Sequence, residues 1–211
     1  MNETTLNILI VEDNPKFLKD ITELIEDRKK QGIRVEADYA THYKTALQML
    51  LSKQYDGVIT DLFFPETEGA NEDAYGVEIA RTAKAKKIPT VCVTSTYHHG
   101  TKTEKYWSEL DDVGVCLVDQ SPGINDSQDF VANTKEFEGA YALLLAFMRV
   151  PSGERGQINC MYTFVKNLGY FRSQGQECVN KKLSDLCEAP RIKDILESYC
   201  KGMFIVNESE K

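Results

Sequence analysis

The first 150 residues alternate between short, continuous apolar runs and longer stretches in which apolar residues recur at three- and four-residue spacing. The continuous runs predict buried strands, and one more polar run predicts an edge strand. The predicted strands are 7–12, 33–39 (the polar one), 56–60, 90–94 and 113–118. The predicted helices are about 14–30, 41–51, 76–86, 103–110 and 129–149. Strands and helices in strict alternation predict an α/β protein with a doubly wound, five-stranded parallel sheet.

The pattern changes near residue 150. The predicted helix 129–149 is apolar on more than one face, which indicates that something besides the sheet covers it. The run Pro151-Ser-Gly-Glu-Arg-Gly156 then interrupts the pattern. We therefore expect a domain at residues 1–150 and a helical C-terminal extension at 151–211. The extension has two amphipathic patterns, too little for a core of its own, so we expect it to dock on the domain or to form a homodimer.

Polar residues stand at the carboxyl ends of four of the predicted strands. Glu12 ends the first and Asp13 follows it, Asp61 follows the third, Thr94 ends the fourth and Asp119 follows the fifth. In doubly wound sheets, ligands bind outside the carboxyl ends of the strands. The sequence thus predicts one acidic pocket at this edge. The plainer alternative is that these acids only cap helices or face solvent.

Composition narrows the classes of function. The net charge is -8, and the acidic excess lies within residues 1–150, so the strongly basic balance needed to neutralise nucleic-acid phosphates is missing. The sequence has no apolar run of the ~20 residues that a membrane helix needs, and its first residues lack a signal-peptide pattern. We expect a cytoplasmic protein without nucleic-acid or membrane partners. The six cysteines form no C-x-x-C pair and are expected to be ordinary structural residues.

Residues 5–149 resemble the receiver (CheY-like) domains of two-component response regulators. The resemblance is carried by Ile8-Leu-Ile-Val-Glu-Asp13-Asn14, by Asp61 with Pro65 four positions later, by Thr94-Ser95, and by the fivefold alternation. In that family a strand-3 aspartate accepts a phosphoryl group from a histidine kinase, and an acidic pair binds magnesium.

Carried over by position, the resemblance implies a role for each site residue. Asp61 would be the phosphoacceptor and Thr94 the switch hydroxyl. Glu12, Asp13 and Asp61 would bind Mg²⁺, together with the backbone carbonyl of Phe63. Mg²⁺ is a hard, octahedral ion that prefers carboxylate and phosphate oxygens and water, which suits this set.

Two features depart from the family pattern. The family has a lysine just after the fifth strand, and Asp119 is expected at that position; no Lys or Arg occurs between Lys105 and Lys135. Lys102, His98 and His99 are candidates for a substitute cation. The other departure is the segment between Pro65 and Gly76, which is longer and more acidic than the family's loop and is expected to be a surface loop.

Three functions follow as hypotheses. The leading one is a response-regulator signalling module that accepts phosphate on Asp61 with Mg²⁺, as in a phosphorelay. Its partners would be a histidine kinase or phosphotransfer protein and a downstream protein, and it would be no enzyme beyond self-phosphorylation. The alternative is a phosphorylation-independent pseudo-receiver that works as an interaction or dimerisation module. A magnesium-dependent phosphohydrolase is the weakest, because Phe63 stands where a second aspartate would be needed.

Overall fold

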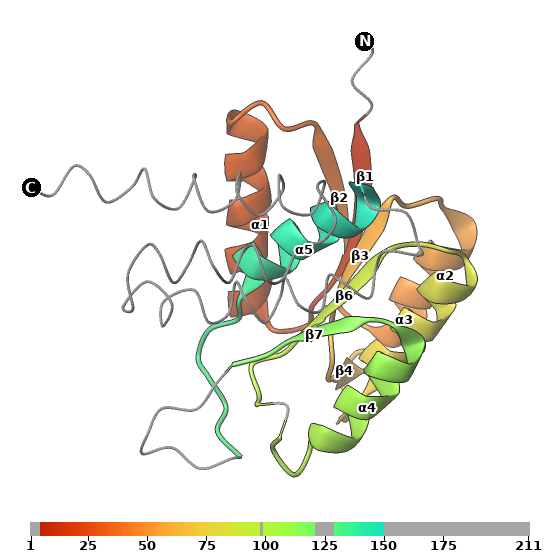
Figure 1. Ribbon diagram of the computed structural model, residues 1–211, viewed down its shortest axis with the longest axis vertical. Helices are drawn as coiled ribbons and strands as arrows, with labels where there is room; N and C mark the ends of the chain where they lie inside the picture. Colours follow the sequence, from red (N-terminus) through yellow and green to blue (C-terminus); the bar gives the residue numbers. More distant parts are fainter. Residues whose placement is uncertain (1–4, 98, 121–128, 150–211) are drawn as a thin grey trace, which may run out of the picture. The chain divides into compact units, whose positions relative to one another are not determined.

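The computed structural model describes residues 5–97, 99–120 and 129–149 (Figure 1). The chain divides into two compact units, Met1–Leu144 and Leu145–Lys211, and most of the described residues belong to the first. The predicted C-terminal helices lie outside the described residues, so the extension and the boundary at 150 stay predictions.

The described elements alternate as the sequence predicted, with one short hairpin added. In chain order they are β1 (Leu6–Val11), α1 (Pro15–Lys30), β2 (Val35–Ala40), α2 (Tyr43–Ser52), β3 (Gly57–Asp61), β4 (Phe64–Pro65), β5 (Glu72–Asp73), α3 (Tyr75–Ala85), β6 (Thr90–Val93), α4 (Glu104–Val113), β7 (Cys116–Val118) and α5 (Phe137–Arg149).

The main sheet has five strands in the order β2-β1-β3-β6-β7, and every neighbouring pair is parallel. This is the flavodoxin-like order of doubly wound sheets, with its switch point between β1 and β3. The predicted fold class is therefore confirmed for the described part of the chain. Val11 pairs with Thr60, and Val93 pairs with both Asp61 and Val118. The strands β1, β3, β6 and β7 consequently end almost level, which brings the residues that follow them to one edge.

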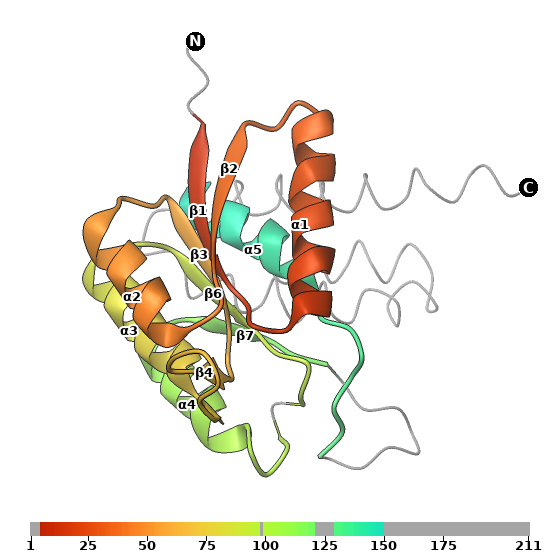
Figure 2. The same cartoon turned by 180° about the vertical axis from the view of Figure 1, so that it is seen from behind.

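Helices cover both faces of this sheet (Figures 1 and 2). α1 and α5 lie on one face, and α2, α3 and α4 lie on the other. Successive side chains of a strand point to opposite faces of the sheet, so each strand packs against both layers of helices. Leu9 and Val11 of β1 pack in the cluster that includes Ala46 and Leu50 of α2 and Ile79 of α3. Further along the same face, Leu117 of β7 packs in a second cluster that also holds Leu110 of α4.

Three local predictions were wrong. The segment 65–75 is not a plain loop, since β4 and β5 pair in it as an antiparallel hairpin. The last strand begins at Cys116 rather than at 113, because α4 runs to Val113 and ends on Gly114 in the left-handed conformation (φ 74°). The last helix begins at Phe137 rather than at 129. The residues before it are extended, and they prove to be part of the site.

Helices long and apolar enough to span a bilayer are absent from the described ranges.

Candidate functional site

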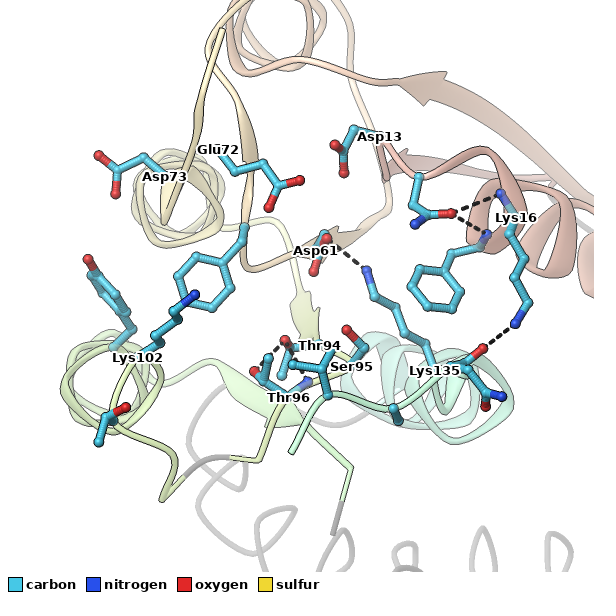
Figure 3. A pocket seen from close by; sticks show the side chains of 18 of the residues that line it. Asp13, Lys16, Asp61, Glu72, Asp73, Thr94, Ser95, Thr96, Lys102 and Lys135 are labelled. Atoms are coloured by element: carbon cyan, nitrogen blue, oxygen red, sulfur yellow. Dashed lines mark hydrogen bonds and ion pairs between the residues drawn. The ribbon is translucent and has the colours of Figure 1, made fainter. Parts of the chain in front are cut away.

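An open cavity of about 840 Å³ lies at the carboxyl edge of the sheet (Figure 3). Side chains that follow β1, β3 and β6 line it, as do residues of the β4–β5 hairpin and of the segment before α5. Asp13, Asp61, Phe63 and Thr94 are among the lining residues that the sequence singled out. The predicted pocket is thus present, at the edge where doubly wound sheets bind ligands.

The acidic cluster forms because two central strands end side by side. Glu12 and Asp13 come directly after β1, and Asp61 is the last residue of β3. One carboxylate oxygen from each of the three lies within 4.8 Å of the others. Glu12 is fully buried and Asp61 is 6% exposed, while Asp13 is partly exposed. The three acids are therefore one site.

A lysine sits among these acids. The Lys135 ammonium lies 2.7 Å from Asp61 Oδ2 (Figure 3). It also lies 2.6 Å from Glu12 Oε2, and its side chain is only 2% exposed. It also lies over the Phe17 ring, 4.8 Å from the centroid, within the range of a cation–π contact. The cation observed beside Asp61 is thus Lys135, which was not among the substitutes that the sequence suggested.

Lys135 was missed because it lies far beyond β7 and inside a segment predicted to be helical. One signal was present, since Lys135 is the first Lys or Arg that follows Lys105 in the sequence. Asp119, expected at the lysine position, directly follows β7 and is buried. It is not among the described residues that line the cavity. In this chain, therefore, Asp119 follows the last strand, whereas a different residue, Lys135, supplies the cation in the pocket.

The other candidate cations differ from Lys135. Lys102 is exposed and lines the cavity on the side of α4, with no ion pair to the three acids among the described contacts. The His99 ring packs edge-on against Tyr97 and Trp107, at centroid distances of 5.4 and 5.9 Å. His98 lies outside the described residues.

Burial and mutual repulsion raise the pKa of the acids. Desolvation, aided by the charge of Asp61, raises the pKa of Glu12 to about 8, although Lys135 opposes this. Burial likewise raises the pKa of Asp61 to about 6 against the influence of Lys135, and burial raises the pKa of Asp13. Burial disfavours charge on Lys135, but Asp61 and Glu12 outweigh it and raise the pKa of the ammonium. In the pocket as it stands, the acids hold protons more tightly than usual.

The set fits a divalent cation. When ionised, three carboxylates and one ammonium leave two negative charges in a largely buried site. A hard dication would balance these charges. Such ions prefer oxygen ligands, which the three carboxylates supply. Phe63 lines the same cavity, and ligation through its carbonyl stays a prediction.

Hydrogen bonds from the backbone fix the orientation of two carboxylates. The Leu62 N–H donates to Asp61 Oδ1 at 2.7 Å, and the Asn14 N–H donates to Glu12 Oε1 at 3.2 Å. Asn14 is also the N-cap of α1, because its side chain accepts from the Lys16 and Phe17 amides. The start of α1 is thereby tied to the acidic cluster.

The backbone of Asp61 rests directly on α3. A Cβ built on Gly76 would lie 2.2 Å from the Asp61 carbonyl oxygen and 2.8 Å from Leu62 Cα. Only glycine permits this approach. The Gly76 N–H also donates to the Leu62 carbonyl at 3.1 Å. The end of β3 that carries Asp61 is consequently fixed by its contact with α3 as well as by the contacts within the pocket.

Thr94 also lines the cavity and is 1% exposed. Its hydroxyl lies 2.9 Å from that of Thr96, which in turn lies 2.8 Å from that of Thr103 at the start of α4. The predicted switch residue therefore belongs to a short chain of hydroxyl groups that leads from the pocket to a helix.

No protein-family model matches the sequence, and no curated protein sequence matches it. Solved structures do match it in backbone arrangement. The chain is similar to the receiver domain of a sensor histidine kinase from Pseudomonas aeruginosa, whose structure has a magnesium ion in the active-site cleft. The identity is 14%, the match covers 70% of this chain and 100% of that one, and the TM-score is 0.45.

Two further neighbours are of the same kind. A two-component response regulator from Clostridium difficile is 16% identical over 69% of this chain and 97% of its own, with a TM-score of 0.46. The receiver domain of a signal-transduction histidine kinase from Syntrophus aciditrophicus is 16% identical over 70% and 96%, also with a TM-score of 0.46. Receiver domains are thus among the structures that the chain resembles, as the sequence predicted. The similarity concerns the backbone alone, and the fold class rests on the strand order.

Proposed function

We propose that this chain is a receiver-like signalling module that accepts a phosphoryl group on Asp61 with Mg²⁺ bound beside it. The observation that carries the proposal is the Lys135 ammonium, held 2.7 Å from Asp61 Oδ2 and 2.6 Å from Glu12 Oε2. A fixed cation at a nucleophilic carboxylate is what phosphoryl transfer needs, since the transferred group carries its charge on peripheral oxygens.

The transfer would proceed on the carboxylate of Asp61. One of its oxygens forms a bond to the phosphorus of the donor, the bond from phosphorus to the donor atom breaks, and the electron pair leaves with the donor. The product is an acyl phosphate. The Leu62 N–H fixes the orientation of the carboxylate, and Lys135 offsets the negative charge of the arriving group. These are positioning and electrostatic contributions, the main means by which proteins assist phosphoryl transfer.

Glu12, Asp13 and Asp61 would hold the magnesium, with the Phe63 carbonyl as a further ligand. When bound, Mg²⁺ offsets the repulsion between the acids and the phosphoryl oxygens and helps to align them. The raised pKa values of the acids support this assignment, because a cation in the cluster would relieve the repulsion that contributes to them.

Thr94 would sense the new group. Its hydroxyl can exchange the Thr96 hydroxyl for a phosphoryl oxygen, which would break the chain of hydroxyls leading to Thr103 and α4. Such an exchange would bias a two-state surface for a downstream protein. Asp119 takes a structural role in this scheme, at the end of β7 and away from the cavity lining.

The donor would be a histidine kinase or a phosphotransfer protein, and the output a contact with another protein or a second copy of this chain. Two of the neighbours are receiver domains of histidine kinases, which supports a partner of that class without identifying it. The domain would act in two-component signalling and would perform no chemistry beyond its own phosphorylation.

The proposal is tested by incubating the full chain with Mg²⁺ and acetyl phosphate and measuring the intact mass. We expect the added mass of one phosphoryl group on the wild type and none on Asp61→Asn. Circular dichroism should show that the variant is folded. Lys102→Met, a change of a second pocket lysine, should still be labelled, whereas Lys135→Met should not.

The pseudo-receiver alternative makes the opposite prediction. Its physical ground was a pocket too negative to hold a phosphoryl group, and Lys135 weakens that ground. If calorimetry detects Mg²⁺ binding but no phosphoryl group is added from acetyl phosphate or phosphoramidate, the phosphoacceptor proposal fails and the alternative stands.

A further inference from the structure

Lys135 reaches the pocket from an extended segment, residues 129–136, which we call the strap. It connects to the buried start of α5 at Phe137 and runs along the loop between β6 and α4. Val131 forms an isolated antiparallel bridge with Thr96, and the Ala132 N–H donates to the Ser95 carbonyl at 2.8 Å. The strap therefore packs beside the residues that follow Thr94.

Each end of the strap is anchored. At its C-terminal end α5 begins, and Glu138 of α5 pairs with Arg28 of α1 at 2.5 Å. At its N-terminal end Asp129 Oδ1 accepts two hydrogen bonds from one residue, the Thr101 N–H at 2.8 Å and the Thr101 hydroxyl at 2.5 Å. In between, the Lys16 ammonium donates to the Asn133 carbonyl.

A lysine side chain is long and flexible, so holding it in one geometry is entropically costly unless its backbone is already fixed. The sequence around Lys135 has no strand or helix to fix it, because α5 starts only at Phe137. The hydrogen bonds of the strap fix the backbone at Lys135 instead. Of these, the contact with Thr101 depends on the Asp129 side chain, which a substitution can remove without changing a residue of the cavity lining.

We propose that Asp129 is a positioning residue for the phosphoryl-transfer site: by clamping the strap to Thr101, it holds Lys135 between Asp61 and Glu12. The expected effect on phosphoryl transfer rests on the proposed function. The claim that Asp129 holds Lys135 in place does not depend on it. It assigns a specific effect to an exposed acid that lies outside the cavity lining.

The structural content is tested by a double-mutant cycle on the unfolding of the metal-free full chain. Asp129→Ala, Lys135→Met and the double variant are compared with the wild type by denaturant midpoint. If Asp129 acts through Lys135, Asp129→Ala shifts the midpoint clearly in the wild type and much less in the Lys135→Met background. Equal shifts in both backgrounds overturn the proposal, whatever the protein does with phosphate.

Conservative variants separate the clamp from a simple effect of charge. Asp129→Asn removes the charge but keeps the oxygen that accepts both bonds, so it should behave like the wild type. Asp112→Ala, which removes an exposed acid on α4, should likewise change nothing. If Asp129→Asn matches Asp129→Ala instead, the charge and not the clamp matters, and the proposal fails.

The consequence for transfer is tested by the initial rate of labelling with acetyl phosphate. Because small misplacements of a catalytic group are costly, we expect Asp129→Ala to be slower by about tenfold, with Asp129→Asn near the wild-type rate. A wild type that takes up no phosphate refutes the proposed function, while the stability cycle still decides the clamp.

Discussion

The two sides of the pocket are built in different ways. The acidic side comes from β1 and β3, neighbouring central strands whose ends carry Glu12, Asp13 and Asp61. The cationic side comes from the strap, which has no regular structure and owes its course to long-range hydrogen bonds. The comparison shows that a site can join residues fixed by local chain geometry with one fixed only by tertiary contacts. It also indicates which side is easier to disturb.

The largest effect should come from removing the cation. Lys135→Met leaves buried acids without their partner and should lower the free energy of unfolding by about 3 kcal/mol, more at pH 8 than at pH 5, because protonated acids need no partner. Denaturant unfolding measures this. The matched control is Lys102→Met, which removes an exposed cation from the same cavity and should change stability by less than about 0.5 kcal/mol. A larger loss from Lys102→Met would contradict the role given to Lys135, because it would place the stabilising cation on the side of α4.

The next largest effect concerns the packing of α3 against the backbone of Asp61. Gly76→Ala forces a methyl group against the Asp61 carbonyl and Leu62, so we expect a loss of about 2–3 kcal/mol and a displaced Asp61. The control is Gly139→Ala in α5, where an added Cβ meets nothing within 4 Å. That change should stabilise by up to about 1 kcal/mol, because alanine is the better helix former. Thermal unfolding of both variants is the measurement, and a tolerated Gly76→Ala would contradict the close packing.

A more gradual effect concerns pH. The folded state raises the pKa of Glu12 to about 8 and that of Asp61 to about 6, so it binds more protons than the unfolded chain above about pH 4. Stability of the metal-free protein from this source should therefore fall as pH rises from about 4 to 8. Lys135 adds no slope there, because its pKa, raised from 10.5, lies above this range.

Magnesium should counter this trend, because it binds the ionised acids and so gains affinity as pH rises. Denaturant unfolding at several pH values, with EDTA or with Mg²⁺, measures both slopes. Glu12→Gln should flatten the metal-free slope between about pH 6 and 8, where Glu12 dominates. A metal-free protein that grows more stable with pH would contradict the placement of three acids in one buried cluster.

The smallest effect concerns the N-terminal cap of α1. Asn14 caps this helix and lines the pocket, so Asn14→Ala should cost about 1 kcal/mol, while Asn14→Asp should keep the cap. His42 is the N-cap residue of α2 but makes no capping bond with its side chain. His42→Ala should accordingly cost less than Asn14→Ala in the same urea titration. The reverse order would show that the cap does not support the acidic side.

Much of the fold was predictable because the patterns that encode it are local. The apolar runs that form β1, β3 and β6 are buried on both faces of the sheet. Such strands can be recognised in a sequence because nearly all their residues are hydrophobic. The β4–β5 hairpin was not predictable, since its polar residues Glu72 and Asp73 are exposed and have no periodic pattern. The start of α5 was misplaced because helical propensity does not register the contacts that keep the strap extended.

The acidic side of the pocket could be located from the sequence alone. Glu12, Asp13 and Asp61 each stand at or just after the end of a strand, so the parallel order of the sheet brings them together without further information. The cationic side could be located only in the folded chain. The sequence places Asp119 after β7, but the side chain that enters the cluster is Lys135, delivered by a strap that is bound to Ser95, Thr96 and Thr101. The physical reason is that a strand fixes its terminal residue through its own hydrogen bonds, whereas an irregular segment takes its course from partners far away in the chain.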